Sequence, residues 1–185
     1  MSIPPNWPTK KYNIIYADPP WAYRNFSSGK AKGTTTYGSA AHHYSCMDTP
    51  SIQGLPIRDV AATDCWLFMW ATFPNIQAAL YTINAWGFEY KTVAFTWVKT
   101  RGKSWYSGLG FYTNGNAEVC LLARRGRVKR VASNVKQLII HPLGKHSEKP
   151  AEARDRIVTL CGDLPRIELF SRVKVDGWDA WGNEI

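Results

Sequence analysis

Two apolar runs without a charged residue are the strongest strand candidates in the chain. The first, Tyr12 to Ala17, ends abruptly at Asp18, and the second lies within DCWLFMWAT, residues 64–72. Neither run alternates between apolar and polar positions, so we expect both faces of each strand to be covered. This pattern is typical of buried strands in a parallel sheet.

Two later segments repeat apolar residues at helical spacing. PNIQAALYTINAWG (74–87) lies between a proline that can open a helix and a glycine that can close it. EKPAEARDRIVTLCG (148–162) has the same arrangement, with a proline near its first turn and a glycine beyond its last. Further strands are predicted for KTVAFTWV (91–98), AEVCLLA (117–123) and RIELF (166–170).

The order of these elements predicts a single α/β domain over residues 1–185. Strands that alternate with helices favour a three-layer sandwich around a mainly parallel sheet. Ligands of such sheets bind at the carboxyl ends of the strands. Asp18 and Arg172 each follow a predicted strand, so both are candidates for a site at that edge.

Positive charge is concentrated in one segment of the chain. The net charge is +9, and residues 99–149 contain 11 Lys and Arg against two acids, whereas the remaining residues are balanced. Concentrated positive charge beside aromatic residues is typical of a protein that binds a polyanion. The alternative is a solvated face that only keeps the protein soluble.

Several classes of function and location lose support. The chain has no GxxxxGK[ST], HExxH or GxSxG motif, which disfavours phosphoryl transfer, metal-dependent hydrolysis and serine hydrolysis. Its four cysteines show no CxxC spacing, so we expect reduced thiols and no metal site. It also lacks a signal-like or membrane-spanning apolar segment, so we expect a cytoplasmic protein with no membrane partner.

The stretch ADPPW closes the first predicted strand with side chains that suit a specific chemistry. Its two prolines stiffen the backbone and offer carbonyls without a competing N–H. Asp18 and the Pro19 carbonyl can together accept both protons of an amino group on an aromatic ring, while Trp21 stacks on that ring. Such bonds would turn the nitrogen lone pair toward an electrophile held in line. The alternative is an ordinary turn at the end of a strand.

The sequence resembles the MT-A70-type adenine N6-methyltransferases of the compact bacterial and phage type. The resemblance runs in order along nearly the whole chain, through YADPPW, CWLFMWAT, AWGFEYKTVAFTWVKT, HSEKPAEARDRI, RIELFSR and WGNEI. It implies a Rossmann-like, class I fold that uses S-adenosylmethionine (AdoMet), with a permuted order in which the catalytic motif precedes the cofactor strand. It also implies that the catalytic motif is Asp18, Pro19, Pro20 and Trp21.

The same resemblance implies a set of cofactor contacts. Asp18 would lie beside the methionine part of AdoMet, and Lys149 would pair with the methionine carboxylate, as a carboxylate favours a cation. Taken without the resemblance, Lys149 is better read as a surface lysine before a helix, and Glu168 as an acid at the edge of the sheet. The remaining contacts, on the ribose and adenine side, are Glu168, Leu169, Phe170, Arg172, Asn183 and Glu184.

A nucleic acid substrate would present its adenine only after the base leaves the stack. The loop after Trp21 resembles one that closes on such a base, and KTRGKSWYSGLGFY mixes cations with aromatics as a strand-tracking surface does. RRGRVKR is either a phosphate clamp or a solvated loop. The predicted nucleic-acid-binding residues are Arg24, Lys30, Lys32, Tyr44, Lys99, Arg101, Lys103, Arg124, Arg125 and Arg127.

These inferences predict an AdoMet-dependent enzyme that methylates adenine N6 in DNA, without a metal. DNA is preferred because compact members of the family are typical of bacteria and their phages. Two alternatives remain open, which are RNA adenine methylation and a non-catalytic nucleic-acid-binding subunit of a heterodimer. Relatives that pair through the methyltransferase domain make a homodimer a further expectation.

Overall fold

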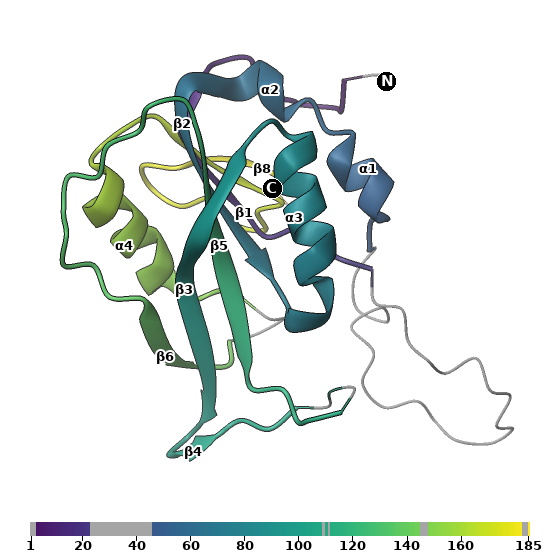
Figure 1. The fold of residues 1–185 in the computed structure, drawn as a ribbon, viewed down its shortest axis with the longest axis vertical. Coiled ribbons are helices and arrows are strands. Elements are labelled where there is room, and N and C mark those ends of the chain that lie inside the picture. The colour runs from purple at the N-terminus through teal and green to yellow at the C-terminus, as the bar shows by residue number, and fades with distance from the viewer. Residues whose placement is uncertain (1–2, 23–45, 109, 111, 145–147, 183–184) are drawn as a thin grey trace, which may run out of the picture.

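The computed structural model describes residues 3–22, 46–108, 110, 112–144, 148–182 and 185. Among them, eight strands form one sheet in the order β4-β3-β5-β2-β1-β7-β8, with β6 paired to β3 (Figure 1). The strands are β1 (Tyr12–Ala17), β2 (Ala61–Ala71), β3 (Glu89–Arg101), β4 (Ser104–Trp105), β5 (Ala117–Arg125), β6 (Leu138–Pro142), β7 (Arg166–Leu169) and β8 (Asp179–Trp181).

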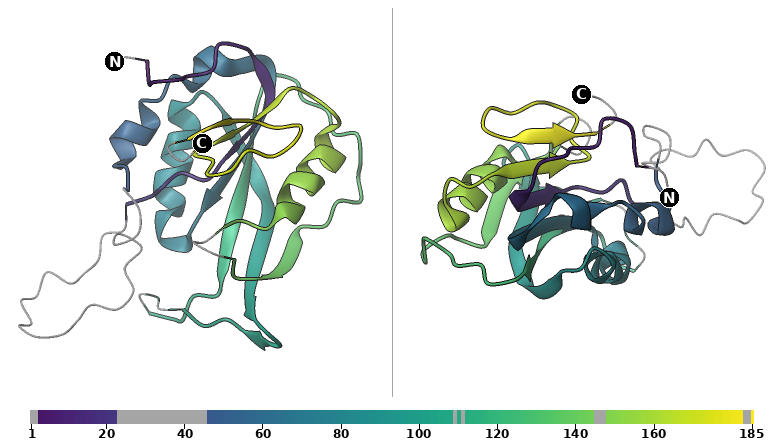
Figure 2. Two further views of the ribbon diagram at one scale, coloured as in Figure 1. Left: turned by 180° about the vertical axis from the view of Figure 1, so that it is seen from behind. Right: turned by 90° about the horizontal axis from the view of Figure 1, so that it is seen from above.

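Helices cover both faces of the sheet, so the predicted layered α/β class is confirmed. The helices are α1 (Thr49–Gln53), α2 (Ile57–Val60), α3 (Ile76–Ala85) and α4 (Ala151–Cys161), with a 3₁₀ turn η2 at Phe73–Asn75. One apolar cluster joins α1, α2 and α3 to the sheet, and a second joins α4 to the opposite face (Figures 1 and 2).

Strand β1 contributes side chains to both apolar clusters. Ile15 and Ala17 belong to the cluster beneath α1–α3, whereas Ile14 and Tyr16 belong to the cluster beneath α4. Successive side chains of a strand point to opposite faces, so an uninterrupted apolar run is required where both faces are buried. By the same alternation, the next side chain, that of Asp18, lies on the face of the sheet that α4 covers.

The sheet is mainly parallel, as expected, because six of its eight strands run in one direction and only β4 and β5 run in the other. Strands β1, β2, β7 and β8 run parallel, and β6 runs parallel to β3, but β5 is antiparallel to both β2 and β3. The described residues between β3 and β5 include the short strand β4 but no helix, and a parallel pair needs a long crossover, so the chain returns in the opposite direction. Consequently β1, β2, β3 and β6 all finish at one end of the sheet, and β5 begins there. We call this the catalytic end.

The N-terminal segment lies against the edge strand β8. The ring of Trp7 makes an edge contact with the ring of Trp181, with centroids 4.7 Å apart, and the Trp181 indole donates to the carbonyl of Pro5 at 3.2 Å. The ammonium of Lys10 also pairs with the carboxylate of Asp179 at 2.5 Å. These contacts cover one side of the open edge of the sheet. Within the described residues, no helix has the length and apolar character needed to cross a bilayer.

Candidate active site

Asp18 lies directly beyond the carboxyl end of β1, between the neighbouring strands β2 and β7. Its backbone N–H makes the last contact with β7, at 3.5 Å from the carbonyl of Leu169. The strand cannot continue past this point because Pro19 and Pro20 have no N–H to donate to the sheet. The sequence thus ends the strand at the residue that carries the carboxylate.

Trp21 anchors this turn in the protein interior. Its side chain is only 6% exposed, and its indole N–H donates to the backbone carbonyl of Trp70 at 3.0 Å. The Pro19 carbonyl accepts from the backbone N–H of Trp21 at 2.8 Å, and the Pro20 carbonyl accepts from Met47 at 3.0 Å. A carbonyl oxygen has two lone pairs, so Pro19 retains one for a ligand. In this conformation Trp21 serves as a buried anchor, and its stacking on a target base stays a prediction.

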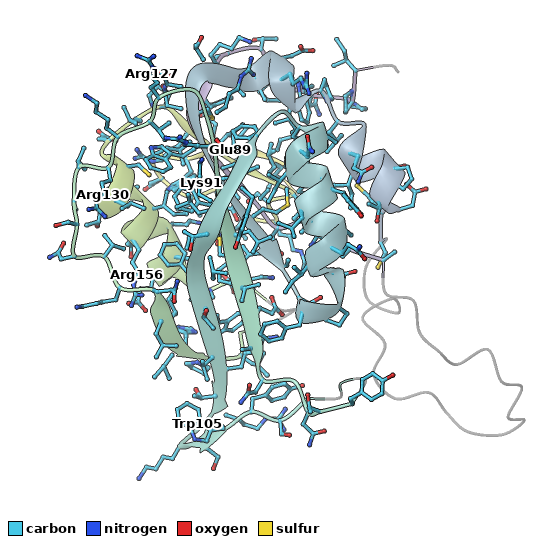
Figure 3. All side chains as sticks on the ribbon, in the orientation of Figure 1. Glu89, Lys91, Trp105, Arg127, Arg130 and Arg156 are labelled. Atoms are coloured by element: carbon cyan, nitrogen blue, oxygen red, sulfur yellow. The ribbon has the colours of Figure 1, made fainter. Side chains whose placement is uncertain are left out.

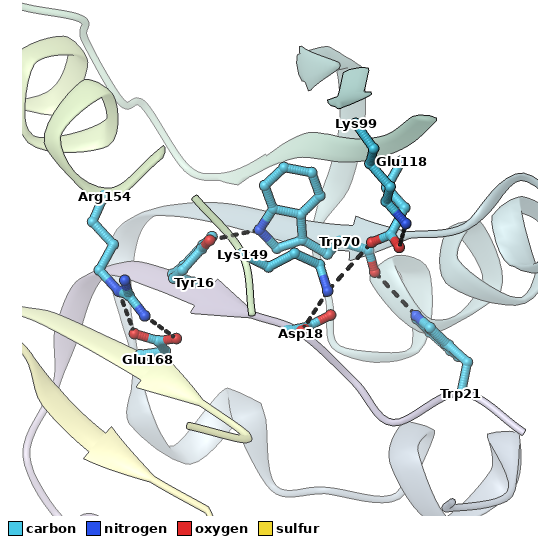
Figure 4. A network of polar contacts seen from close by, with 9 residues as sticks. All are labelled: Tyr16, Asp18, Trp21, Trp70, Lys99, Glu118, Lys149, Arg154 and Glu168. Atoms are coloured by element: carbon cyan, nitrogen blue, oxygen red, sulfur yellow. Dashed lines mark hydrogen bonds and ion pairs between the residues drawn. The ribbon is translucent and has the colours of Figure 1, made fainter. Parts of the chain in front are cut away.

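Four side chains of alternating charge form a continuous ion chain at the catalytic end (Figure 4). Lys149 Nζ lies 2.7 Å from Asp18 Oδ2 and 3.3 Å from Glu118 Oε2, and Glu118 Oε1 lies 2.5 Å from Lys99 Nζ. The side chains of Glu118 and Lys149 are almost fully buried, whereas that of Asp18 is 31% exposed. Asp18 is therefore the member of the chain that faces the outside.

The neighbours within the ion chain decide the protonation of each group. Burial disfavours the charged form of Lys149, but Asp18 and Glu118 outweigh it, so the pKa of Lys149 lies above its ordinary value. Burial likewise opposes ionised Glu118, and the two lysines outweigh it, so the pKa of Glu118 is lowered. For Asp18 burial prevails over Lys149, and the pKa of its carboxyl is raised. Asp18 is thus a better proton acceptor than an ordinary aspartate.

Glu168 lies on the α4 face of β7, beside the ion chain, and is held by a guanidinium (Figure 4). Arg154 of α4 donates to its two carboxylate oxygens at 2.7 and 3.0 Å, and both side chains are about one-tenth exposed. Next to it, the Trp70 indole donates to the hydroxyl of Tyr16 at 2.6 Å. Both oxygens of Glu168 keep further lone pairs, so its predicted contact with ribose stays a prediction.

The other predicted cofactor residues differ in their surroundings. Leu169 is fully buried in the core beneath α1–α3, so only its backbone reaches the catalytic end. Phe170 adopts a φ of +62° and packs edge-on against Trp181, with centroids 5.7 Å apart. Arg172 is near enough to Asp18 for its charge to oppose part of the rise in the pKa of that carboxyl. Asn183 and Glu184 lie outside the described residues.

The predicted nucleic-acid-binding residues divide between the two ends of the sheet. Lys99, Arg101 and Lys103 lie at or beyond the carboxyl end of β3, at the catalytic end. Arg124 and Arg125 end β5, which runs away from Asp18, so they lie about 20 and 24 Å along the strand from Glu118. Figure 3 places the labelled Arg127 at the opposite end of the molecule from Trp105. Arg24, Lys30, Lys32 and Tyr44 lie outside the described residues.

The RRGRVKR run therefore does not line the catalytic end, although its contact with nucleic acid elsewhere stays a prediction. The carboxylate of Glu89 lies 3.9 Å from Arg124 Nε. Asp64 accepts from the backbone N–H of Arg127 at 2.7 Å, which closes the turn at Gly126. That turn has a φ of +69° at Gly126, and a Cβ there would lie 2.4 Å from the Thr63 carbonyl oxygen.

Sequence reasoning did not assign a role to Glu118, Arg154 or Trp70. Glu118 had one available signal, because it is one of two acids in the basic segment 99–149 and opens a buried strand. An unexplained acid at the start of such a strand suggests a buried cation as its partner. Arg154 and Trp70 gave no comparable signal, since their partners lie on other elements.

Comparisons with known proteins agree on one family. The MT-A70 family model matches residues 12–184. The type II methyltransferase M.MunI of Mycoplasma sp is 38% identical over 98% of this chain and 81% of its own length. The N(6)-adenine-specific methyltransferase METTL4 of Homo sapiens is 27% identical over 95% of this chain, which spans 38% of METTL4. The N6-methyladenosine RNA methyltransferase MTA1 of Pyricularia oryzae is 25% identical over 94% of this chain and 47% of its own length.

Proposed function

The chain belongs to the MT-A70 family, and on that premise we propose that it transfers a methyl group from AdoMet to the N6 amine of adenine in DNA. One observation carries the proposal. The Asp-Pro-Pro-Trp motif is intact, and it presents a carboxylate at the carboxyl end of β1 with the Lys149 ammonium 2.7 Å away. Ligands of layered α/β proteins bind at such strand ends.

The charged groups around Asp18 fit the methionine part of AdoMet, which carries both a carboxylate and an ammonium. Lys149 would hold the carboxylate, and Asp18 would accept from the ammonium. Arg172 adds a second cation near Asp18. Glu168, Phe170, Asn183 and Glu184 are proposed for the ribose and adenine side.

The protein has two tasks in the reaction, which are to orient the amine and to receive its proton. Asp18 accepts one N6 proton in a hydrogen bond, and the free lone pair of the Pro19 carbonyl accepts the other, which directs the nitrogen lone pair away from the motif. AdoMet supplies a methyl group already activated by its sulfonium, so no metal is needed. The new N–C bond would form as the S–CH₃ bond breaks and a neutral thioether leaves with the electron pair, so the nitrogen would gain positive charge and then lose a proton. Asp18 is suited to take that proton because burial raises the pKa of its carboxyl.

DNA is proposed over RNA because the identity to the type II methyltransferase exceeds that to the RNA methyltransferase. The target base would have to leave the stack or lie in an unpaired strand, at a cost of a few kcal/mol. A homodimer also stays a prediction.

Methyl transfer from labelled AdoMet tests the proposal directly. The substrates are single-stranded DNA, duplex DNA and RNA of matched sequence, and Asp18→Asn serves as the inactive control. We expect label on adenine N6 of DNA that falls at least about a hundredfold in the variant, as for loss of a positioned acid or base. Label confined to RNA would overturn the substrate class. Absence of both label and AdoMet binding would favour the non-catalytic subunit.

A further inference from the structure

A pocket of about 570 Å³ lies at the catalytic end, between the ends of β3 and β6. These strands are parallel neighbours, with Thr100 opposite Pro142, so their carboxyl ends lie at the same end of the sheet as that of β1. The lining residues are Lys99, Thr100, Arg101, Gly102, Tyr106, Pro142, Leu143 and Gly144. The Asp-Pro-Pro-Trp motif is not among them, so the pocket is separate from the turn that would hold the target amine.

The lining of the pocket combines cations with an aromatic ring and contains no acid. The Arg101 guanidinium lies 5.7 Å from the centroid of the half-buried Tyr106 ring, and Lys99 adds its ammonium at the wall. Lys99 Nζ has three protons, and its one described carboxylate partner is Glu118. Phosphates bind to such cations and bases stack on such rings, so the lining suits a nucleotide.

The walls are held by backbone bonds rather than by side chains alone. The N–H of Tyr106 donates to the carbonyl of Lys99 at 3.0 Å, and the N–H of Leu143 donates to the carbonyl of Thr100 at 3.2 Å. Beyond the pocket, Trp105 is 63% exposed on the projecting β4 segment (Figure 3). An exposed aromatic next to cations extends the same chemistry outward.

The ion chain connects this pocket to the catalytic carboxylate. Lys99 lines the pocket and also binds Glu118, which binds Lys149, which binds Asp18. Three polar contacts of 2.5, 3.3 and 2.7 Å therefore link Lys99 Nζ to the carboxylate of Asp18. A strand whose base is held at Asp18 would continue along this end of the sheet towards the pocket.

We propose that the pocket is a subsite for the nucleotide next to the target adenine in single-stranded DNA, with Tyr106 stacking on its base and Arg101 and Lys99 facing its phosphate. This inference rests on the proposed function and adds the substrate contact that fixes the strand beside the flipped base. It also predicts that residues at and after the end of β3 recognise the sequence around the target adenine, and that the RRGRVKR run at the far end of the sheet does not.

The test is a walk of abasic sites along a DNA oligonucleotide that contains one adenine. Each position on either side of the adenine is replaced in turn, and kcat/KM for methyl transfer is measured for the wild type and for Tyr106→Ala. We expect one adjacent abasic site to cost the wild type about tenfold or more, as for loss of a stacked base. Tyr106→Ala should lose a similar factor on the intact oligonucleotide and little more on the abasic one.

Matched variants at the other end of the sheet provide the controls. Tyr90→Ala removes an exposed aromatic from β3 and Lys11→Gln removes an exposed cation before β1, and both should respond to the abasic walk like the wild type. Arg101→Gln should weaken binding and flatten its dependence on salt, whereas Lys11→Gln should do so less.

The outcomes separate this inference from the proposed function. If DNA is methylated but no adjacent abasic site matters, or if the losses from Tyr106→Ala and the abasic site multiply, the subsite is refuted while the function stands. If nothing is methylated, the same set of abasic oligonucleotides is labelled and its binding is measured by fluorescence anisotropy. This measurement tests the subsite independently of methyl transfer. A neighbour effect found only with RNA, or a change of oligomeric state in Tyr106→Ala without a neighbour effect, would overturn the proposal.

Discussion

Lys149 is the cation on which both carboxylates of the ion chain depend, so replacing it with methionine is a sharp perturbation. Methionine keeps an unbranched apolar stem over the Trp70 ring, which lies 5.8 Å from the ammonium, while the charge is removed. Asp18 then loses the cation that most lowers the pKa of its carboxyl. Glu118 keeps only Lys99 as a described partner.

The expected cost follows from burial. Removing one partner of a buried ion pair typically costs 3–5 kcal/mol, and the lower end applies because Asp18 is partly exposed to water. We therefore expect Lys149→Met to lower the free energy of unfolding by about 3 kcal/mol at pH 7. Urea denaturation of both proteins gives this difference directly, provided that the slope m is unchanged.

The pH dependence of that difference tests the cause. In the folded wild type the pKa of Lys149 lies above 10.5, which is its pKa in the unfolded chain. The ion pairs of Lys149 therefore contribute their full stability at every pH below 10.5. In Lys149→Met both carboxylates have higher pKa values than in the wild type, so the variant loses relative stability as pH rises through the range in which they ionise. The difference should thus shrink as pH falls through the raised pKa values of these carboxylates in the variant, because protonation relieves the unpaired charges. A difference below about 1 kcal/mol at pH 7, or one that grows as the solution is acidified, would refute the ion chain as described.

Three further predictions concern the surroundings of the site. Arg154→Met leaves Glu168 buried without its guanidinium and should cost about 3–5 kcal/mol in urea denaturation, whereas the double variant with Glu168→Gln should recover part of that loss. Tyr16→Phe leaves the Trp70 indole N–H without its described acceptor and should cost about 1–3 kcal/mol, and an unchanged midpoint would contradict the buried bond. Gly126→Ala and Gly102→Ala should each lose about 1–2 kcal/mol because both glycines have a positive φ, and Gly126→Ala should lose more because only there would the new Cβ meet the Thr63 carbonyl oxygen.

Local pattern was sufficient for the main elements. The run Tyr12–Ala17 predicted β1 with its observed bounds, because a strand covered on both faces leaves an unmistakable apolar stretch. Residues 74–87 and 148–162 enclose α3 and α4, as their proline and glycine limits predicted. The short elements α1, α2, β4, β6 and β8 were not predicted, since each has five residues or fewer, which is too short for a periodic pattern to be recognised.

The direction of β5 is the feature that local pattern did not reveal, and it altered the site. A strand that is apolar on both faces looks the same whether its neighbours are parallel or antiparallel. With β5 reversed, its first residues, including Glu118, join Asp18, and its last residues, Arg124 and Arg125, lie at the far end of the sheet. The pairing of Asp18 with Lys149 spans 131 residues and came from the family resemblance, not from spacing.

The contacts between the N-terminal segment and β8 have a practical consequence for anyone who shortens or tags this protein. An edge strand with unpaired backbone groups can pair with a strand of another molecule. Here the N-terminal segment covers side chains of β8 and is held there by the contacts of Trp7 and Lys10. A truncation that starts at β1 would leave the catalytic end intact but bare the ring of Trp181. Loss of solubility in such a fragment would then reflect association between copies at the exposed sheet edge, and not damage to the active site.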